Sequence, residues 1–352
     1  MRVLSKPSTA KCDLNLYMLF LLAEPKYVSC TRLEQLLEDL SHDSVNRFLL
    51  RERYTPADLF TLVSPHITLS GGTLSGDDSV IDKPYSDPSK TELIDFYWSG
   101  KHKKTVKGIN IISLYYTDIN GISMPVNYRL NDKKDGKTKH DYFREMIQEV
   151  VLWGLCPLYI TADSWYASVD TLNYLKNEDY RGLFAVEPNR LVSLDGAPYS
   201  HVSKLDIPDD GLVVHLKKVG TVKVFRTVFK NDYRYYIMFV PRPNEGESLD
   251  ELEAFEAIDE QCFKTVHAHH WGIEQYHRAL KQVCNIERFH VRDTAAIGTH
   301  IFGALCAFVE LEIKRATGII HNWYALRRHL FDDVIRSFVI DEIAEVVKRQ
   351  PA

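Results

Sequence analysis

The sequence lacks paired cysteines. Its 352 residues include six cysteines, and none of them forms a Cys-x-x-Cys pair. Such pairs are typical of structural zinc sites, and a dense set of cysteines in a short chain is typical of a disulfide framework. We therefore expect neither a structural zinc ion nor disulfide bonds, and we expect a reducing cellular compartment.

Long apolar runs are also missing. No stretch of about 18 uncharged apolar residues occurs, and the nearest candidate, Ala295 to Val309, is shorter and contains His300. The segment from Met1 to Asp13 mixes charges and lacks the apolar part of a signal peptide. These features predict a soluble, cytoplasmic protein that has no membrane partner.

The chain has no overall excess of positive charge, since its net charge is −5. Taken alone, this value disfavours a nucleic-acid partner, because phosphate contacts require Lys and Arg. However, eight acidic residues and no basic residue lie between Glu245 and Glu260, so the remainder of the chain carries a net charge of +3. Such segregation is typical of a protein that binds a polyanion with one face.

The first 72 residues have the pattern of short helices, with Ser41 as a predicted N-cap of the third. Two adjoining short helices suit a helix-turn-helix DNA-binding domain, but any small helical packing domain shows the same pattern. We therefore predict a helical region over residues 1–72 and leave DNA binding as one of two interpretations. The predicted helices span 14–23, 31–40 and 41–51.

Strand patterns begin at Thr73. Asn120-Gly121 lies between two alternating runs, which is a strong hairpin signal. Pro125 lies inside the second of these runs, so that strand should lie at a sheet edge. A mixed α/β sheet is predicted, with strands at 73–81, 106–116, 122–130, 158–161 and 183–186 and helices at 140–153 and 169–176.

A second strand-rich segment, residues 188–243, interrupts this series and carries an excess of Lys and Arg. Its predicted strands are followed by an acidic connector at 244–260 and by a long helix at about 263–285. Further helices are predicted at 295–315 and 323–347. The segment therefore has the pattern of a basic β-insertion between two parts of one core.

Two carboxylates are predicted to meet at one sheet edge. The first and fourth strands are natural neighbours, so Asp78, near the end of the first, and Asp163, just past the fourth, can converge. Carboxylates that are forced together repel each other unless a cation neutralises them, and hard oxygen ligands select Mg²⁺ or Mn²⁺. A third acid from a helix would complete a site for two metal ions.

Glu274 is the best third candidate because of its neighbours on the long helix. His267, His270, Arg278 and Lys281 are spaced so that they share its face. A carboxylate among cations suits metal binding beside DNA phosphates. The ordinary alternative is an amphipathic helix whose charged face is solvated.

Three blocks of the sequence resemble the signature blocks of bacterial insertion-sequence transposases of the DDE type. They are residues 77–85 (DDSVIDKPY), 160–166 (ITADSWY) and 270–282, which contains Glu274. The most similar group belongs to the cut-and-paste superfamily with a β-insertion before the Glu and a Tyr-x2-Arg-x3-Glu-x6-Lys (YREK) signature. The resemblance implies a ribonuclease-H-like core, similar to retroviral integrase, over 73–187 and 261–316. It also implies an inserted β subdomain at 188–243 and a helical C-terminal region at 317–352.

The resemblance also implies a function, namely metal-dependent cleavage at transposon ends and strand transfer into target DNA. Asp78, Asp163 and Glu274 would be the catalytic residues and would bind two Mg²⁺ or Mn²⁺ ions. Asp78 is favoured over Asp77 because the family's first acid is commonly followed by Thr or Ser, and Ser79 follows Asp78. The implied partners are double-stranded DNA and a second copy of the chain, in the bacterial nucleoid.

The family signature also predicts DNA contacts around Glu274. Lys281 matches the family's Lys, whereas His267 and His270 stand where the family has Tyr and Arg. Neutral histidines bind phosphate more weakly than Arg does. We expect these three residues, together with Arg278 and Trp271, to contact DNA.

Two other interpretations stay open. The cluster of His267, His269 and His270 could hold zinc together with Glu274, although no His-Glu-x-x-His motif is present. Alternatively, the chain could bind DNA without cutting it, because two signature positions carry histidine.

Overall fold

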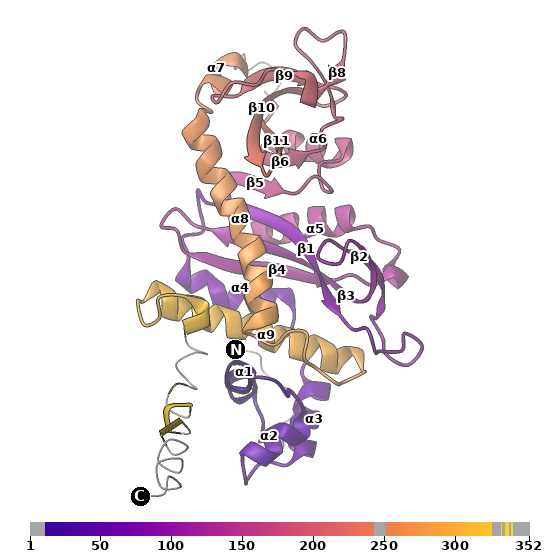
Figure 1. Ribbon diagram of the computed structural model, residues 1–352, viewed down its shortest axis with the longest axis vertical. Coiled ribbons are helices and arrows are strands. Elements are labelled where there is room, and N and C mark those ends of the chain that lie inside the picture. The colour runs from indigo at the N-terminus through magenta and orange to yellow at the C-terminus, as the bar shows by residue number, and fades with distance from the viewer. Residues whose placement is uncertain (1–10, 243–250, 326–331, 333–334, 338, 341–352) are drawn as a thin grey trace, which may run out of the picture. The chain divides into compact units, whose positions relative to one another are not determined.

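The computed structural model describes residues 11–242, 251–325, 332, 335–337 and 339–340 (Figure 1). The chain divides into two compact units. The first unit comprises residues 1–55, 81–95 and 277–352, and the second comprises 56–80 and 96–276. Most of the helix predicted at 323–347 lies outside the described residues.

The first unit is helical. It contains α1 (Leu14–Ala23), α2 (Cys30–Leu36), α3 (His42–Arg51) and α9 (Thr294–Ala316), and both α1 and α3 pack against α9. The Ser41 hydroxyl accepts a hydrogen bond from the Ser44 N–H, so the predicted N-cap of α3 is confirmed. Short helices of this length gain most of their stability from such packing.

Helix α9 is the core element of the first unit. By length and composition it could cross a membrane, but 78% of its most apolar 18-residue window is buried inside the structure. The buried His300 side chain of α9 meets the Tyr17 hydroxyl of α1 at 2.9 Å, which satisfies two polar groups within the core. The burial is typical of the core helix of a globular unit.

The second unit is built on one 11-stranded mixed sheet. The strands lie in the order β2-β3-β1-β5-β6-β11-β10-β9-β7-β8, and β4 pairs with β3. Their bounds are β1 (Thr73–Asp82), β2 (Asp95–Ser99), β3 (Lys104–Thr117), β4 (Ser123–Leu130), β5 (Tyr159–Ala162), β6 (Arg181–Val186), β7 (Leu191–Ser193), β8 (Ser200–His201), β9 (Leu212–Leu216), β10 (Gly220–Phe229) and β11 (Asp232–Phe239).

The pairing confirms two predictions about this sheet. β1 and β5 are parallel neighbours, as expected for the first and fourth predicted strands. β4 pairs with β3 alone, so Pro125 lies at a sheet edge, opposite Tyr115 and beside a β-bulge. The strands of the predicted insertion do not form a separate sheet, because β11 pairs with β6 and extends the same one.

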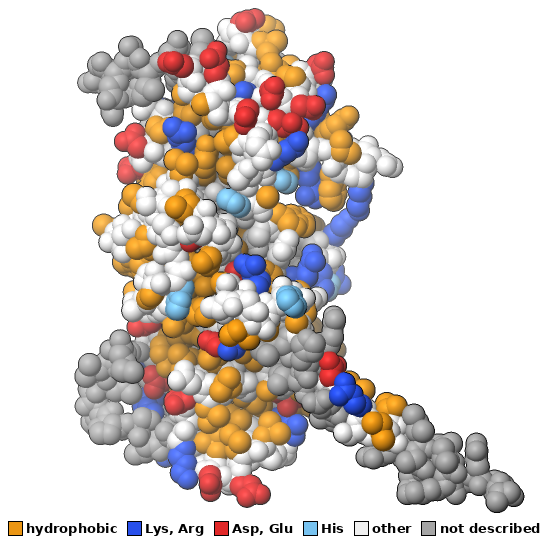
Figure 2. All heavy atoms as spheres, turned by 90° about the vertical axis from the view of Figure 1, so that its left-hand side faces the viewer, with side chains coloured by type: hydrophobic (Ala, Val, Ile, Leu, Met, Phe, Trp, Pro, Cys, Tyr) orange, Lys and Arg blue, Asp and Glu red, His pale blue; other side chains and the backbone are white. Residues whose placement is uncertain are grey.

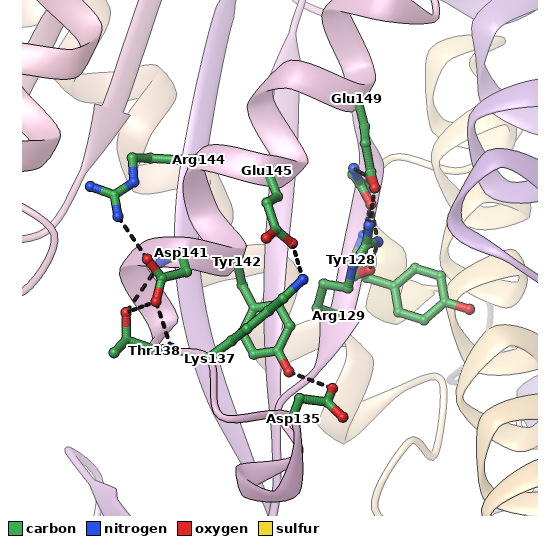
Figure 3. A network of polar contacts seen from close by, with 11 residues as sticks. Tyr128, Arg129, Asp135, Lys137, Thr138, Asp141, Tyr142, Arg144, Glu145 and Glu149 are labelled. Carbon is green, nitrogen blue, oxygen red and sulfur yellow. Dashed lines mark hydrogen bonds and ion pairs between the residues drawn. The ribbon is translucent and has the colours of Figure 1, made fainter.

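The helices of the second unit are α4 (Pro56–Val63), α5 (Lys139–Leu152), α6 (Val169–Asn177), α7 (Glu251–Glu256) and most of α8 (Glu260–Gln282). A capping box starts α5: the Thr138 hydroxyl accepts from the Asp141 N–H, and the Asp141 carboxylate accepts from the Thr138 N–H. Figure 3 shows this start of the helix, together with the ion pair between Arg144 and Asp141. Because Lys139 is the first residue of α5, the capping box also fixes its position.

A hydrophobic core lies between the extended part of the sheet and the start of α8. Phe225 of β10 stacks on Phe263 of α8 with ring centroids 4.5 Å apart. The predicted acidic connector also contributes apolar side chains, since Phe255 and Ile258 are buried in this core. Lys223, which we counted in the basic insertion, is buried and donates to the carbonyl oxygens of both residues. The Lys223 ammonium therefore links the acidic connector to the sheet inside the core.

A substitution at Gly182 would test the packing of this sheet. It lies opposite Phe239 in the β11–β6 pair, and a Cβ added at Gly182 would lie 2.2 Å from Cζ of that ring. We predict that Gly182→Ala lowers the free energy of unfolding by about 1–3 kcal/mol, measured by urea denaturation. Gly298→Ala is the control, because nothing lies within 4 Å of its added Cβ. A Gly182→Ala protein as stable as the wild type would contradict this packing.

Candidate functional site

The register of two parallel strands brings two acidic residues to one level of the sheet. Gly76 of β1 is paired with Ala162 of β5. The next residue on β1 is Asp77, and the next residue after β5 is Asp163. Adjacent parallel strands lie about 4.8 Å apart, so these two residues are direct neighbours across the sheet.

Alternation decides which side chains share a face of β1. Thr73 lies 3.0 Å from Nδ1 of His269 on α8, so the face of Thr73 is the one that α8 covers. Gly76 faces the other side, where a Cβ would meet the Phe143 ring of α5. Successive strand residues point to opposite faces. Asp77 therefore shares the α8 face, and Asp78 shares the α5 face.

The same argument applies to β5. The Thr161 hydroxyl lies 3.1 Å from Nδ1 of His270 on α8, and Thr161 also donates to the Ser75 hydroxyl of β1 at 2.9 Å. Asp163 comes two residues after Thr161, at the next position on the α8 side. The α8 face of the β1–β5 pair therefore carries Asp77 and Asp163 together.

Helix α8 brings Glu274 to this face. Tyr276 of α8 stacks on Tyr115 of β3 with ring centroids 4.9 Å apart, and Gly272 packs against the same tyrosine. Together with the contacts of His269 and His270, these put α8 across β5, β1 and β3, as Figure 1 shows. Glu274 is exposed, and its charge raises the pKa of Asp77.

The electrostatics of the site are those of crowded carboxylates. Burial raises the pKa of Asp77 well above its ordinary value, and the charges of Asp78 and Glu274 raise it further. Burial, followed by the charges of Asp77 and Asp78, raises the pKa of Asp163 to about 7. Both carboxyls thus resist ionisation near neutral pH unless a cation compensates their charge.

Asp78 lies in a different environment. Its carboxylate accepts hydrogen bonds from Lys139 Nζ at 2.7 Å, from Asn110 Nδ2 at 2.6 Å and from the Tyr166 hydroxyl at 3.2 Å. Lys139 therefore already supplies the charge that Asp78 needs. We did not predict Lys139, Asn110 or Tyr166 as site residues. Tyr166 alone gave a signal, because it ends the second sequence block.

Backbone donors hold Asp163 in place. The N–H of Trp165 donates to Asp163 Oδ1 at 3.0 Å, and the N–H of Tyr166 donates to the same oxygen at 3.4 Å. These bonds favour the charged form and thus oppose the rise in the pKa of Asp163. They occupy one carboxylate oxygen of Asp163.

The three histidines near Glu274 each contact other residues. His267 lies against the rings of Tyr236 and Phe263, while His269 and His270 meet separate threonines on separate strands. Burial lowers the pKa of His270 to about 4, so its ring is neutral at physiological pH. The zinc interpretation is disfavoured by geometry, because the three rings contact different residues and no group of three possible ligands occurs within the described part of the chain. Their predicted DNA contacts stay predictions.

The other predicted DNA contacts have varied surroundings. Trp271 is 44% exposed on α8, and Arg278 is exposed one turn after Glu274. Lys281 pairs with Glu287 at 3.4 Å within the first unit. Arg278 and Lys281 belong to that unit, so the structure leaves their predicted roles at the carboxylates untested.

The chemistry of this donor set suits a divalent metal ion. Carboxylate oxygens are hard ligands, and a bound Mg²⁺ or Mn²⁺ would relieve the repulsion of Asp163 by Asp77 and of Asp77 by Glu274. Within residues 11–242 and 251–325 and the few described beyond them, no three His, Cys, Asp or Glu side chains are already grouped as ligands.

Comparisons with known proteins agree with the sequence blocks. The family model described as the transposase DDE domain matches residues 77–309, about two thirds of the chain. A search of the curated proteins finds no match. Among solved structures, the chain is similar to the C-terminal lobe of a budding yeast Argonaute, at 12% identity and a TM-score of 0.23. That match covers 87% of this chain and 63% of the other, and it is too weak to support an argument.

The raised pKa of Asp163 predicts a pH-dependent cost in the metal-free protein. Because the pKa of Asp163 is higher in the folded than in the unfolded protein, the free energy of unfolding falls as the pH rises from about 4 toward 7. Asp163→Asn should therefore be more stable than the wild type at pH 8, by on the order of 2 kcal/mol. This advantage should disappear near pH 4. Thermal melts in EDTA across this range measure it, and equal stability at pH 8 would contradict the crowding.

Proposed function

Because the chain belongs to the family of transposases with a DDE domain, we propose that it cuts DNA at the ends of a mobile element and joins them to target DNA. The observation that carries this proposal is the strand register that puts Asp77 beside Asp163 on the face of a mixed sheet that is covered by α8, the helix of Glu274. The parallel β1-β5-β6 arrangement with an antiparallel β3–β4 hairpin supports a ribonuclease-H-like core.

We assign the first metal-binding carboxylate to Asp77, where the sequence favoured Asp78. Three facts support the change: Asp77 shares the α8 face, Glu274 acts on its pKa, and Lys139 already neutralises Asp78. Asp78 is then a positioning residue that fixes the end of β1 against α5. Asp163 and Glu274 keep the roles that the sequence predicted.

Two divalent cations bound by these carboxylates would activate the attacking oxygen and stabilise the leaving oxygen of a phosphodiester. The protein's own part is to position the ligands. The N–H groups of Trp165 and Tyr166 orient Asp163, and the Tyr276–Tyr115 stack holds α8 over the strands. The raised pKa values keep Asp77 and Asp163 partly protonated until metal binds.

DNA binding is proposed from the family and from the charge pattern. Figure 2 shows several acidic side chains close together near the top of one face and several basic side chains close together near its middle. The β10–β11 hairpin adds Arg226, stacked near the Tyr233 ring, and Arg234, 3.6 Å from the centroid of Phe229. Joining two DNA ends requires two active sites, so we propose a dimer on DNA.

A second candidate function is DNA binding without cleavage. The observation that favours it is the neutral, packed state of His270, which stands at the position of the family's Arg. With this function, the chain would bind the DNA ends of the mobile element without cutting them. The experiment below separates the two functions.

Cleavage assays on substituted proteins test the assignment. The substrate is labelled duplex DNA from the two flanks of the gene. In Mg²⁺, Asp77→Asn, Asp163→Asn and Glu274→Gln should each slow nicking by about a thousandfold or more, while binding in EDTA persists. Asp78→Asn, the matched neighbour, should keep more activity than Asp77→Asn.

Two results would contradict this account. Active Asp77→Asn beside inactive Asp78→Asn would return the ligand role to Asp78. Binding by the wild type without nicking in either Mg²⁺ or Mn²⁺ would support the second candidate.

Metal addition should also stabilise the folded protein. Mg²⁺ or Mn²⁺ relieves carboxylate repulsion in the folded state alone, so millimolar metal should raise the melting temperature by a few degrees at pH 8. The rise should shrink at pH 5.5, where Asp163 is protonated. Asp163→Asn should show little rise at either pH. A wild-type rise that Asp163→Asn shares would place the metal elsewhere.

A further inference from the structure

An exposed tryptophan lies beside the carboxylates. Trp165 is 63% exposed, although Trp is usually well buried in proteins. It follows Asp163 by two residues, and its own N–H donates to the Asp163 carboxylate. Asp163 and the exposed indole ring of Trp165 are therefore held close together by one short turn.

A positive charge accompanies this ring. Lys139 Nζ lies 5.6 Å from the centroid of Trp165 and 2.7 Å from Asp78 Oδ2. The next residue, Tyr166, is buried, and its ring packs on Phe143 with centroids 4.8 Å apart. The turn thus directs Tyr166 into the core and leaves Trp165 outside, next to a cation.

We propose that Trp165 stacks on an unpaired nucleobase of the DNA strand that enters the carboxylate site, with the Lys139 ammonium near the adjoining phosphate. This inference rests on the proposed function, because the phosphodiester at Asp163 is what brings a base within reach of the ring. Aromatic rings bind bases of any sequence in single-stranded DNA, and Lys contributes the phosphate contact. An apolar protein surface fits less well, because covering Trp165 would also desolvate the Lys139–Asp78 pair.

Stacking on Trp165 has a direct optical signature. The protein is titrated in EDTA, which prevents cleavage, with an oligothymidylate of about 20 nucleotides, and the fluorescence of its tryptophans is followed. DNA should quench the wild type, and Trp165→Phe should remove most of this quenching. Trp98→Phe is the matched control, since Trp98 is 64% exposed, and it should keep the quenching.

Affinity and salt dependence separate stacking from a merely structural role. Trp165→Ala should weaken oligothymidylate binding about tenfold at every salt concentration, whereas Trp165→Phe should restore most of the affinity. Lys139→Met should instead lower the slope of affinity against salt. Thermal melts should show unchanged stability for both Trp165 variants.

Quenching that survives in Trp165→Phe, or wild-type affinity in Trp165→Ala, overturns the proposal. The flank-cleavage assay is scored separately. Cutting by the wild type with no effect of Trp165 on DNA binding would remove the stacking role and leave the proposed function. Stacking on Trp165 without cutting would keep this inference and remove the proposed function.

Discussion

The site depends on electrostatic repulsion between carboxylates that backbone pairing forces together. Parallel pairing of β1 with β5 fixes Asp77 and Asp163 at one level of the sheet, and α8 adds Glu274 over the same face. The backbone at Asp77 and at Asp163 can move apart only if the register between β1 and β5 is broken. Crowded carboxylates destabilise a folded protein on their own, and a divalent cation turns the same crowding into a binding site.

The surrounding residues keep this crowding in place. The Tyr276–Tyr115 stack and the contacts of His269 and His270 with Thr73 and Thr161 hold α8 across the strands. On the opposite face, Lys139, Asn110 and Tyr166 satisfy Asp78. The sheet therefore carries two adjacent acids in different surroundings: Lys139 compensates the charge of Asp78, whereas burial and the charges of Asp78 and Glu274 raise the pKa of Asp77.

Much of this arrangement could be predicted from the sequence, because it follows from local patterns. The predicted bounds of α1 match the structure, and the Asn120-Gly121 hairpin and the edge position of Pro125 follow from backbone chemistry. The strands β2, β7 and β8 were missed, and β7 and β8 have only three and two residues, too few to show an alternating pattern. The choice between Asp77 and Asp78 depends on which face α8 covers, and the residues that follow each acid do not reveal this.

The histidines show the same limit. Their helical spacing is visible in the sequence, but the pKa of His270 depends on burial against Thr161, which only the docking of α8 determines.

The most direct test of the central claim is a crystal structure grown with Mn²⁺, whose anomalous scattering locates the metal. We predict manganese bound to Asp77 and Asp163. Manganese bound to Asp78, with Asp77 left aside, would contradict it.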